Sequence, residues 1–122
     1  MEEPTNLMMI TGVSLLDKLP DFERFRKTLE VRLLTLDRFT MRVVEPTIPV
    51  GTPHWEADPN FDLDAHVHRV ALPAPGDMTE LQRFISDLAS TPLDFSKPLW
   101  NVHLVENVEG GAAMVMRLHH CI

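Results

Sequence analysis

Two β-type runs close to the end of this 122-residue chain constrain its fold more than any other feature. Leu99–Val108 and Ala112–His120 are joined by Asn107–Gly111, whose two adjacent glycines suit a tight hairpin turn. The second run is apolar over Ala113–Leu118 except for Arg117, which is typical of a strand in the middle of a sheet. The sequence therefore predicts a sheet built around two antiparallel strands.

Two helices are predicted on the N-terminal side of this hairpin. Pro20 and Asp21 begin the first, with Asp21 as its N-cap. Asp77 and Glu80 have the spacing of a capping box at the start of the second. The apolar positions that recur every three or four residues are Phe22, Phe25, Leu29, Leu33 and Leu36 in the first helix, and Met78, Leu81, Phe84, Ile85 and Leu88 in the second. Each helix therefore has one face to bury.

Shorter β-compatible segments complete the expected fold. They are Leu7–Val13, Phe39–Val44, His54–Glu56 and His66–Leu72, and a proline-rich stretch over 46–53 predicts an irregular loop. Together the elements predict an α+β fold, a mixed α/β sandwich in which two helices pack on a sheet of about four to six strands. Residues 1–122 are interpreted as a single partial domain, because the chain stops directly after a predicted core strand.

Composition narrows the function classes. The net charge is −7, from 18 acidic and 11 basic residues, which argues against nucleic acid as a partner because phosphate binding needs a basic surface. The single cysteine leaves no internal disulfide and fits a reducing compartment, and no secretory signal is visible. No apolar run approaches the ~20 residues that span a bilayer. A cytoplasmic protein is therefore expected.

A pair of histidines ends the last run. Side chains alternate across a strand, so His119 and His120 should lie on opposite faces. His120 would share its face with Met116 and Leu118, and His119 would share the other with Arg117. One of the two can therefore do chemistry while the other is structural. An unperturbed pKa of ~6.5 suits a general base, although a structural hydrogen-bonding role is the commoner one for a strand-end histidine when the residues alone are considered.

Two other candidate sites are weaker. The oxygen-bearing series that starts at Asp58 begins like a calcium-binding EF-hand loop, but Leu63 stands at its sixth position and Arg69 at its twelfth, so a solvated turn is favoured. No histidine spacing supports zinc, so no metal site is expected. Cys121 beside His120 suggests a cysteine nucleophile, but sequence neighbours on a strand point apart, and a small buried thiol is favoured.

Residues 116–122 (Met-Arg-Leu-His-His-Cys-Ile) resemble the first part of the His-His-x-x-x-Asp-Gly motif. That motif marks the CoA-dependent acyltransferase superfamily, which includes chloramphenicol acetyltransferase and peptide-synthetase condensation domains. Further segments resemble the bacterial wax ester synthase/diacylglycerol acyltransferase family, in the same order along the chain. They are Pro53–Trp55, Asp58–Val67, Leu72–Asp77, Ser90–Asp94, Pro98–Trp100 and His103–Val105.

The resemblance implies the N-terminal half of a chloramphenicol-acetyltransferase-like fold that ends inside the motif, whose Asp and Gly would follow Ile122. It implies that His120 is the general base and that His119 is its structural partner. The acceptor would be diacylglycerol or a long-chain alcohol, the donor acyl-CoA, and the product triacylglycerol or wax ester. Acyl-CoA is then a substrate, and no permanently bound cofactor is implied.

Pro98, Leu99 and Trp100 correspond to a family motif that would help to shape the substrate tunnel. From the residues alone, Trp100, Val102 and Leu104 alternate on one strand face and are most simply core. A structural role is therefore the favoured interpretation of this segment.

Several alternatives stay open. The chain could be a superfamily acyltransferase with a different acceptor, a catalytically inactive truncated fragment, or a half-enzyme that needs a partner chain to supply the missing C-terminal half. An unpaired central strand at its end predicts association. Lipid substrates would allow peripheral contact with the inner membrane or lipid inclusions, but neither helix shows a Lys/Arg-rich polar face with exposed aromatic residues.

Overall fold

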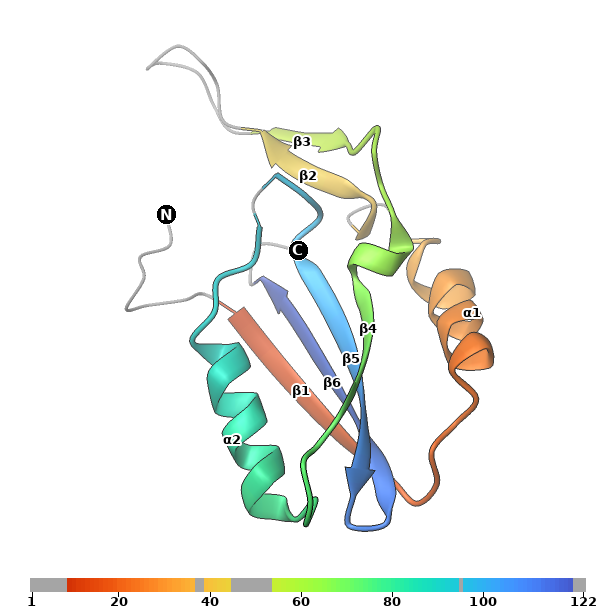
Figure 1. Cartoon of the computed structure of the whole chain (residues 1–122). Helices are drawn as coiled ribbons and strands as arrows, with labels where there is room; N and C mark the ends of the chain where they lie inside the picture. The colour runs from red at the N-terminus through yellow and green to blue at the C-terminus, as the bar shows by residue number, and fades with distance from the viewer. Residues whose placement is uncertain (1–8, 37–38, 45–53, 95, 120–122) are drawn as a thin grey trace.

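The computed structural model of the chain describes residues 9–36, 39–44, 54–94 and 96–119. It contains a four-stranded sheet in the order β1-β6-β5-β4 and a separate two-stranded sheet of β2 and β3 (Figure 1). The strands are β1 (Met9–Leu16), β2 (Met41–Val44), β3 (His54–Ala57), β4 (Val67–Ala71), β5 (Trp100–Val108) and β6 (Gly111–His119); the helices are α1 (Phe22–Leu33), α2 (Met78–Ala89) and the short 3-10 helix η2 (Leu63–Ala65). The predicted α+β class is confirmed.

The predicted hairpin forms the centre of the main sheet. β5 and β6 pair from Trp100 opposite Leu118 to Val108 opposite Gly111, and Gly110 in the turn has a φ of 82°, a left-handed conformation that glycine adopts without a steric penalty. β1 pairs antiparallel with the other edge of β6, and β4 runs parallel to β5. The expectation of an unpaired central strand is therefore wrong, because β1 fills the position beside β6.

Both helices begin at the predicted caps. The Asp21 carboxylate accepts a hydrogen bond from the Arg24 backbone N–H at 3.1 Å, and the Asp77 carboxylate accepts one from the Glu80 backbone N–H at 3.0 Å. Each bond satisfies a backbone donor that the first helical turn leaves without a partner inside the helix. Leu36 lies beyond the end of α1, and Met78 is 37% exposed at the first position of α2, so the prediction of a buried Met78 is wrong.

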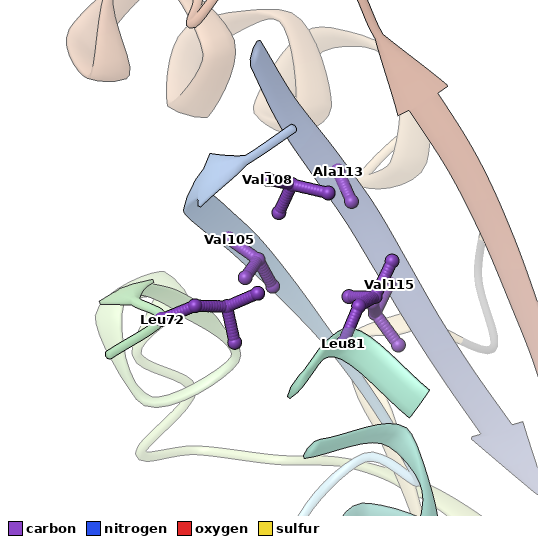
Figure 2. Close-up of a cluster of buried hydrophobic side chains, with 6 residues drawn as sticks. All are labelled: Leu72, Leu81, Val105, Val108, Ala113 and Val115. Atoms are coloured by element: carbon purple, nitrogen blue, oxygen red, sulfur yellow. The ribbon is translucent and has the colours of Figure 1, made fainter. Parts of the chain in front are cut away.

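The two helices cover opposite faces of the main sheet, and each face has its own cluster of buried side chains (Figure 1). The cluster under α2 is aliphatic; Figure 2 shows Leu81 of α2 beside Val115 of β6. The buried members on this face are Leu72, Leu81, Val105, Val108, Ala113 and Val115, and those on the α1 face are Phe39, Leu63, Val67, Trp100 and Val102. Strand alternation thus divides β5 and β6 between two cores.

Several sequence-based expectations fall outside the described residues. These are the irregular loop over 46–53, the first part of the Leu7–Val13 strand, and residues 120–122, which include His120 and Cys121. In the part of the chain that is described, neither helix is both long enough and apolar enough to cross a membrane.

Candidate active site at the end of strand β6

His119 is the last residue of β6 and is buried, with 7% of its surface exposed. Its backbone N–H donates to the carbonyl oxygen of Leu99 at 2.9 Å, which fixes the strand end against the start of β5. Alternation along β6 puts its side chain on the same face as Val115, which packs under α2. This is the face predicted for the structural member of the pair, and its role remains a prediction.

The opposite face of β6 is the one predicted for His120, which itself lies outside the described residues. Met114, Met116 and Leu118 are half-buried on this face and pack against the cluster that contains Trp100. These side chains make the approach to the strand end apolar.

The segment Pro98–Trp100 is buried and lies directly against this strand end. Trp100 is 1% exposed, pairs with Leu118 across the sheet, and donates its indole N–H to the carbonyl oxygen of Phe39 at 2.8 Å. The Phe39 and Trp100 rings meet edge to face with 5.4 Å between centroids. The prediction that Trp100, Val102 and Leu104 belong to the core is confirmed, since all three are fully buried.

His66 lies buried beside Trp100, a contact that the sequence does not predict. It is 3% exposed, and its imidazole ring stacks between those of Phe61 and Trp100, with centroid distances of 5.2 and 4.8 Å. Its Nδ1 lies 2.7 Å from the Trp100 carbonyl oxygen, and because a carbonyl only accepts, Nδ1 must carry the proton. Burial is the main cause that lowers the pKa of His66 below its ordinary value, which favours the neutral ring.

Arg117 ties the strand end to two other segments. It is fully buried on the α2 face of β6, donates a hydrogen bond to the Thr91 carbonyl oxygen just after α2, and contacts the Met9 sulfur of β1 at 3.1 Å. In the sequence, Arg117 is only a polar interruption of an apolar strand. The structure makes it a cross-link between β6 and the segment that follows α2.

A cleft of about 270 Å³ opens beside Trp100. Its polar lining includes His66, Lys97, Asn101, His103 and Arg117. Burial, the nearby His68 ring and Arg117 together lower the pKa of His103 to about 4, so its imidazole is neutral near pH 7. The cleft therefore presents two neutral histidines, two cations and the Asp94 carboxylate, which suits it to hold polar groups or water.

The acidic turn that resembles a calcium loop uses its carboxylates locally. Asp58 accepts a hydrogen bond from the Asn60 backbone N–H and Asp62 one from the Asp64 backbone N–H, each at 3.0 Å. Asp64 forms an ion pair with Arg26 of α1 at 2.6 Å. These carboxylates shape the turn and attach it to α1. The described residues contain no group of three metal-ligating side chains.

Solved structures share this arrangement of sheet, helices and strand end. The wax ester synthase/diacylglycerol acyltransferase from Marinobacter aquaeolei VT8 matches 98% of this chain and 30% of its own, with a TM-score of 0.81 and 28% identity. The starter condensation domain of rhizomide synthetase matches 93% of this chain and 28% of its own, with a TM-score of 0.73 and 14% identity. The chain therefore has the fold of part of these chloramphenicol-acetyltransferase-like structures.

Sequence comparison narrows this class. Residues 1–122 match the wax ester synthase/diacylglycerol acyltransferase catalytic domain family. A putative diacylglycerol O-acyltransferase of Mycobacterium tuberculosis H37Rv is 39% identical over 114 residues, which are 93% of this chain and 23% of the relative. The probable diacylglycerol O-acyltransferase tgs1 of the same strain is 40% identical over 84% of this chain and 22% of its own length. The chain belongs to the wax ester synthase/diacylglycerol acyltransferase family. It spans less than a quarter of the length of these two relatives.

Proposed function

We propose that this chain is the N-terminal part of an acyltransferase that moves a fatty acyl group from acyl-CoA to the hydroxyl of diacylglycerol or a long-chain alcohol. The observation that carries the proposal is the family match over residues 1–122, which includes the sequence pair His119–His120. The products are triacylglycerol or wax ester and free CoA. The class of reaction is direct acyl transfer without a covalent acyl-enzyme.

In the proposed mechanism, His120 acts as the general base. Its neutral imidazole takes the proton from the acceptor hydroxyl while that oxygen attacks the thioester carbon of acyl-CoA. The carbon–sulfur bond breaks, and the departing CoA sulfur takes the proton back from the imidazolium. The backbone N–H of His119 ties the strand end to Leu99, its buried side chain packs that end in place, and the apolar face of Met114, Met116 and Leu118 keeps water away from the thioester.

We further propose that catalysis needs the part of the fold that this chain does not contain. The relatives are about four times as long, which supports a second half that supplies the opposite wall of the substrate tunnel. Pro98, Leu99 and Trp100 would shape the tunnel indirectly, because they hold the start of β5 against the histidine strand. The protein would work in the cytoplasm, in peripheral contact with a membrane or lipid inclusion where its acceptor is found.

The test uses a chimera of the 40% identical mycobacterial relative, in which this chain replaces the segment that it matches. Turnover is measured with a long-chain acyl-CoA and either diacylglycerol or a long-chain alcohol. His120→Ala should lower kcat roughly 100-fold or more, whereas Cys121→Ala, a neighbour with no assigned chemical role, should change it little. The 122-residue chain alone should show no turnover.

Three results would contradict the proposal. They are a folded chimera inactive with both acceptors, undiminished turnover in His120→Ala, and activity of the isolated chain. Turnover with an amine instead of a hydroxyl acceptor would favour the alternative of a superfamily member with a different acceptor.

A further inference from the structure

The side chains that α1 exposes to solvent are those opposite the side chains that it buries against the sheet. Phe22, Phe25, Leu29 and Leu33 pack against the cluster that contains Trp100. α1 also lies on the outside of the molecule, on the other side of the sheet from α2 (Figure 1). The side chains opposite these four residues therefore face solvent.

Five residues form this outward face, and we call them the α1 surface. They are Arg24, Lys27, Thr28, Val31 and Arg32, and together they line one shallow depression. At about 100° per residue, they occupy an arc of roughly 140° on the helix. This arc contains three cations and no carboxylate.

The charges on α1 are unevenly distributed, although Arg24 and Lys27 also line a second depression with both glutamates. Its two glutamates, Glu23 and Glu30, lie on one flank with Arg26, which forms ion pairs with Asp64 at 2.6 Å and Glu30 at 3.8 Å. Among the residues that the structure describes, by contrast, the side chains of Arg24, Lys27 and Arg32 have no ion-pair partner. A chain with a net charge of −7 thus carries a concentrated positive surface on one helix.

Val31 lies in the middle of the three cations and is 61% exposed. A basic helix face with an apolar side chain at its centre matches the interface of an anionic bilayer, which offers phosphate headgroups outside and hydrocarbon beneath. The sequence predicts that neither helix combines a Lys/Arg-rich polar face with exposed aromatic residues, and the α1 surface has the basic residues but no aromatic one. Val31 is its exposed apolar side chain.

We propose that the α1 surface is the contact by which the protein binds an anionic lipid surface. Charge complementarity selects this partner, because the remainder of the acidic chain is repelled by such a surface and must face away from it. The inference rests on the proposed function for its choice of a lipid partner and on the described side chains for the rest. Each cation near an anionic bilayer strengthens binding about fivefold, so the three together contribute roughly 100-fold.

Flotation with lipid vesicles tests this inference on the complete 122-residue chain. Vesicles of phosphatidylcholine with phosphatidylglycerol should bind it at low salt, and vesicles of phosphatidylcholine alone or high salt should not. The triple variant R24Q/K27Q/R32Q should lose roughly 100-fold in partitioning. K18Q/R83Q/K97Q is the matched control, because it removes the same charge from exposed positions elsewhere and should lose less than about threefold.

Val31→Asp supplies a second variant that leaves the three cations in place, and it should weaken binding about tenfold. Circular dichroism verifies that each variant keeps its helices. The inference is overturned if the control triple loses as much as the α1 triple, if all variants bind alike, or if millimolar inorganic phosphate or duplex DNA displaces the vesicles at constant ionic strength. These vesicles contain no acceptor and the assay no acyl-CoA, so binding and acyl transfer can fail independently.

Discussion

The two faces of the main sheet are built from different chemistry. The face under α2 holds an aliphatic cluster around Leu81 and Val115, where packing is non-directional (Figure 2). The face under α1 is anchored by directional bonds: the Trp100 indole donates to Phe39, and His66 donates to the Trp100 carbonyl. Aliphatic packing stabilises the sheet as a whole, whereas the directional bonds fix where β5 begins beside the histidine strand. The first face should therefore contribute most of the stability, and the second should contribute less stability while it fixes where β5 begins.

The largest effect is expected from breaking the aliphatic face. Leu81→Ala removes a side chain that is 1% exposed and leaves a cavity against Val115, which should cost about 2–5 kcal/mol of unfolding free energy. Urea denaturation followed by circular dichroism measures this. Gln82→Ala, the exposed neighbour, should cost less than about 0.5 kcal/mol. Equal losses in the two variants would show that the aliphatic cluster does not dominate stability.

Acid should weaken the fold through its buried histidines. Burial lowers the pKa of His103 from 6.5 to about 4, so between these values the folded chain binds fewer protons than the unfolded chain. The free energy of unfolding should therefore fall as pH falls through this window, by on the order of 1–3 kcal/mol. His103→Leu should make stability less dependent on pH over the same range. An unchanged pH dependence would mean that His103 is protonated in the folded chain.

Trp100→Phe probes the directional face. The change keeps an aromatic ring but removes the indole N–H and leaves the buried Phe39 carbonyl without its donor, which should cost about 1–3 kcal/mol. In an active chimera, the preference among acyl chain lengths should change less than stability does. A shift in chain-length preference at unchanged melting temperature would assign Trp100 to the tunnel rather than to the core.

The smallest losses of stability are expected at the helix caps. Asp21 and Asp77 form a matched pair, because each caps one of the two helices. Asp77→Ala and Asp21→Ala each remove one hydrogen bond to a first-turn N–H, and each should cost about 1 kcal/mol. Thermal unfolding of the two variants compares the helices directly. A loss at Asp77 well above that at Asp21 would show that the α2 face depends more strongly on the placement of its helix.

Much of this fold could be predicted from the sequence, because the features concerned depend only on residues a few positions apart. The caps at Asp21 and Asp77, the β5–β6 hairpin and the burial of Trp100 all follow from spacing or alternation over a few positions. Residues 120–122 lie outside the described part, so the assignment of His120 remains a prediction.

The unpredicted features depend on contacts between distant parts of the chain. His66 meets the Trp100 carbonyl across 34 positions, and Arg117 meets Thr91 across 26. β1 joins β6 through a pairing that puts Met9 opposite His119. No local periodicity encodes such pairs, because they form only once the sheet has assembled its strands in a particular order.

The central claim is that strand alternation makes His120 the general base and His119 its structural partner. Single variants of the two residues in the active chimera test this claim most directly. Turnover and melting temperature are measured for His119→Ala and His120→Ala side by side. The account predicts that His120→Ala loses activity roughly 100-fold or more at a nearly unchanged melting temperature, and that His119→Ala, which removes a buried side chain, lowers the melting temperature through a loss of about 1 kcal/mol or more. Full turnover in His120→Ala, with activity lost at unchanged stability in His119→Ala, would contradict it.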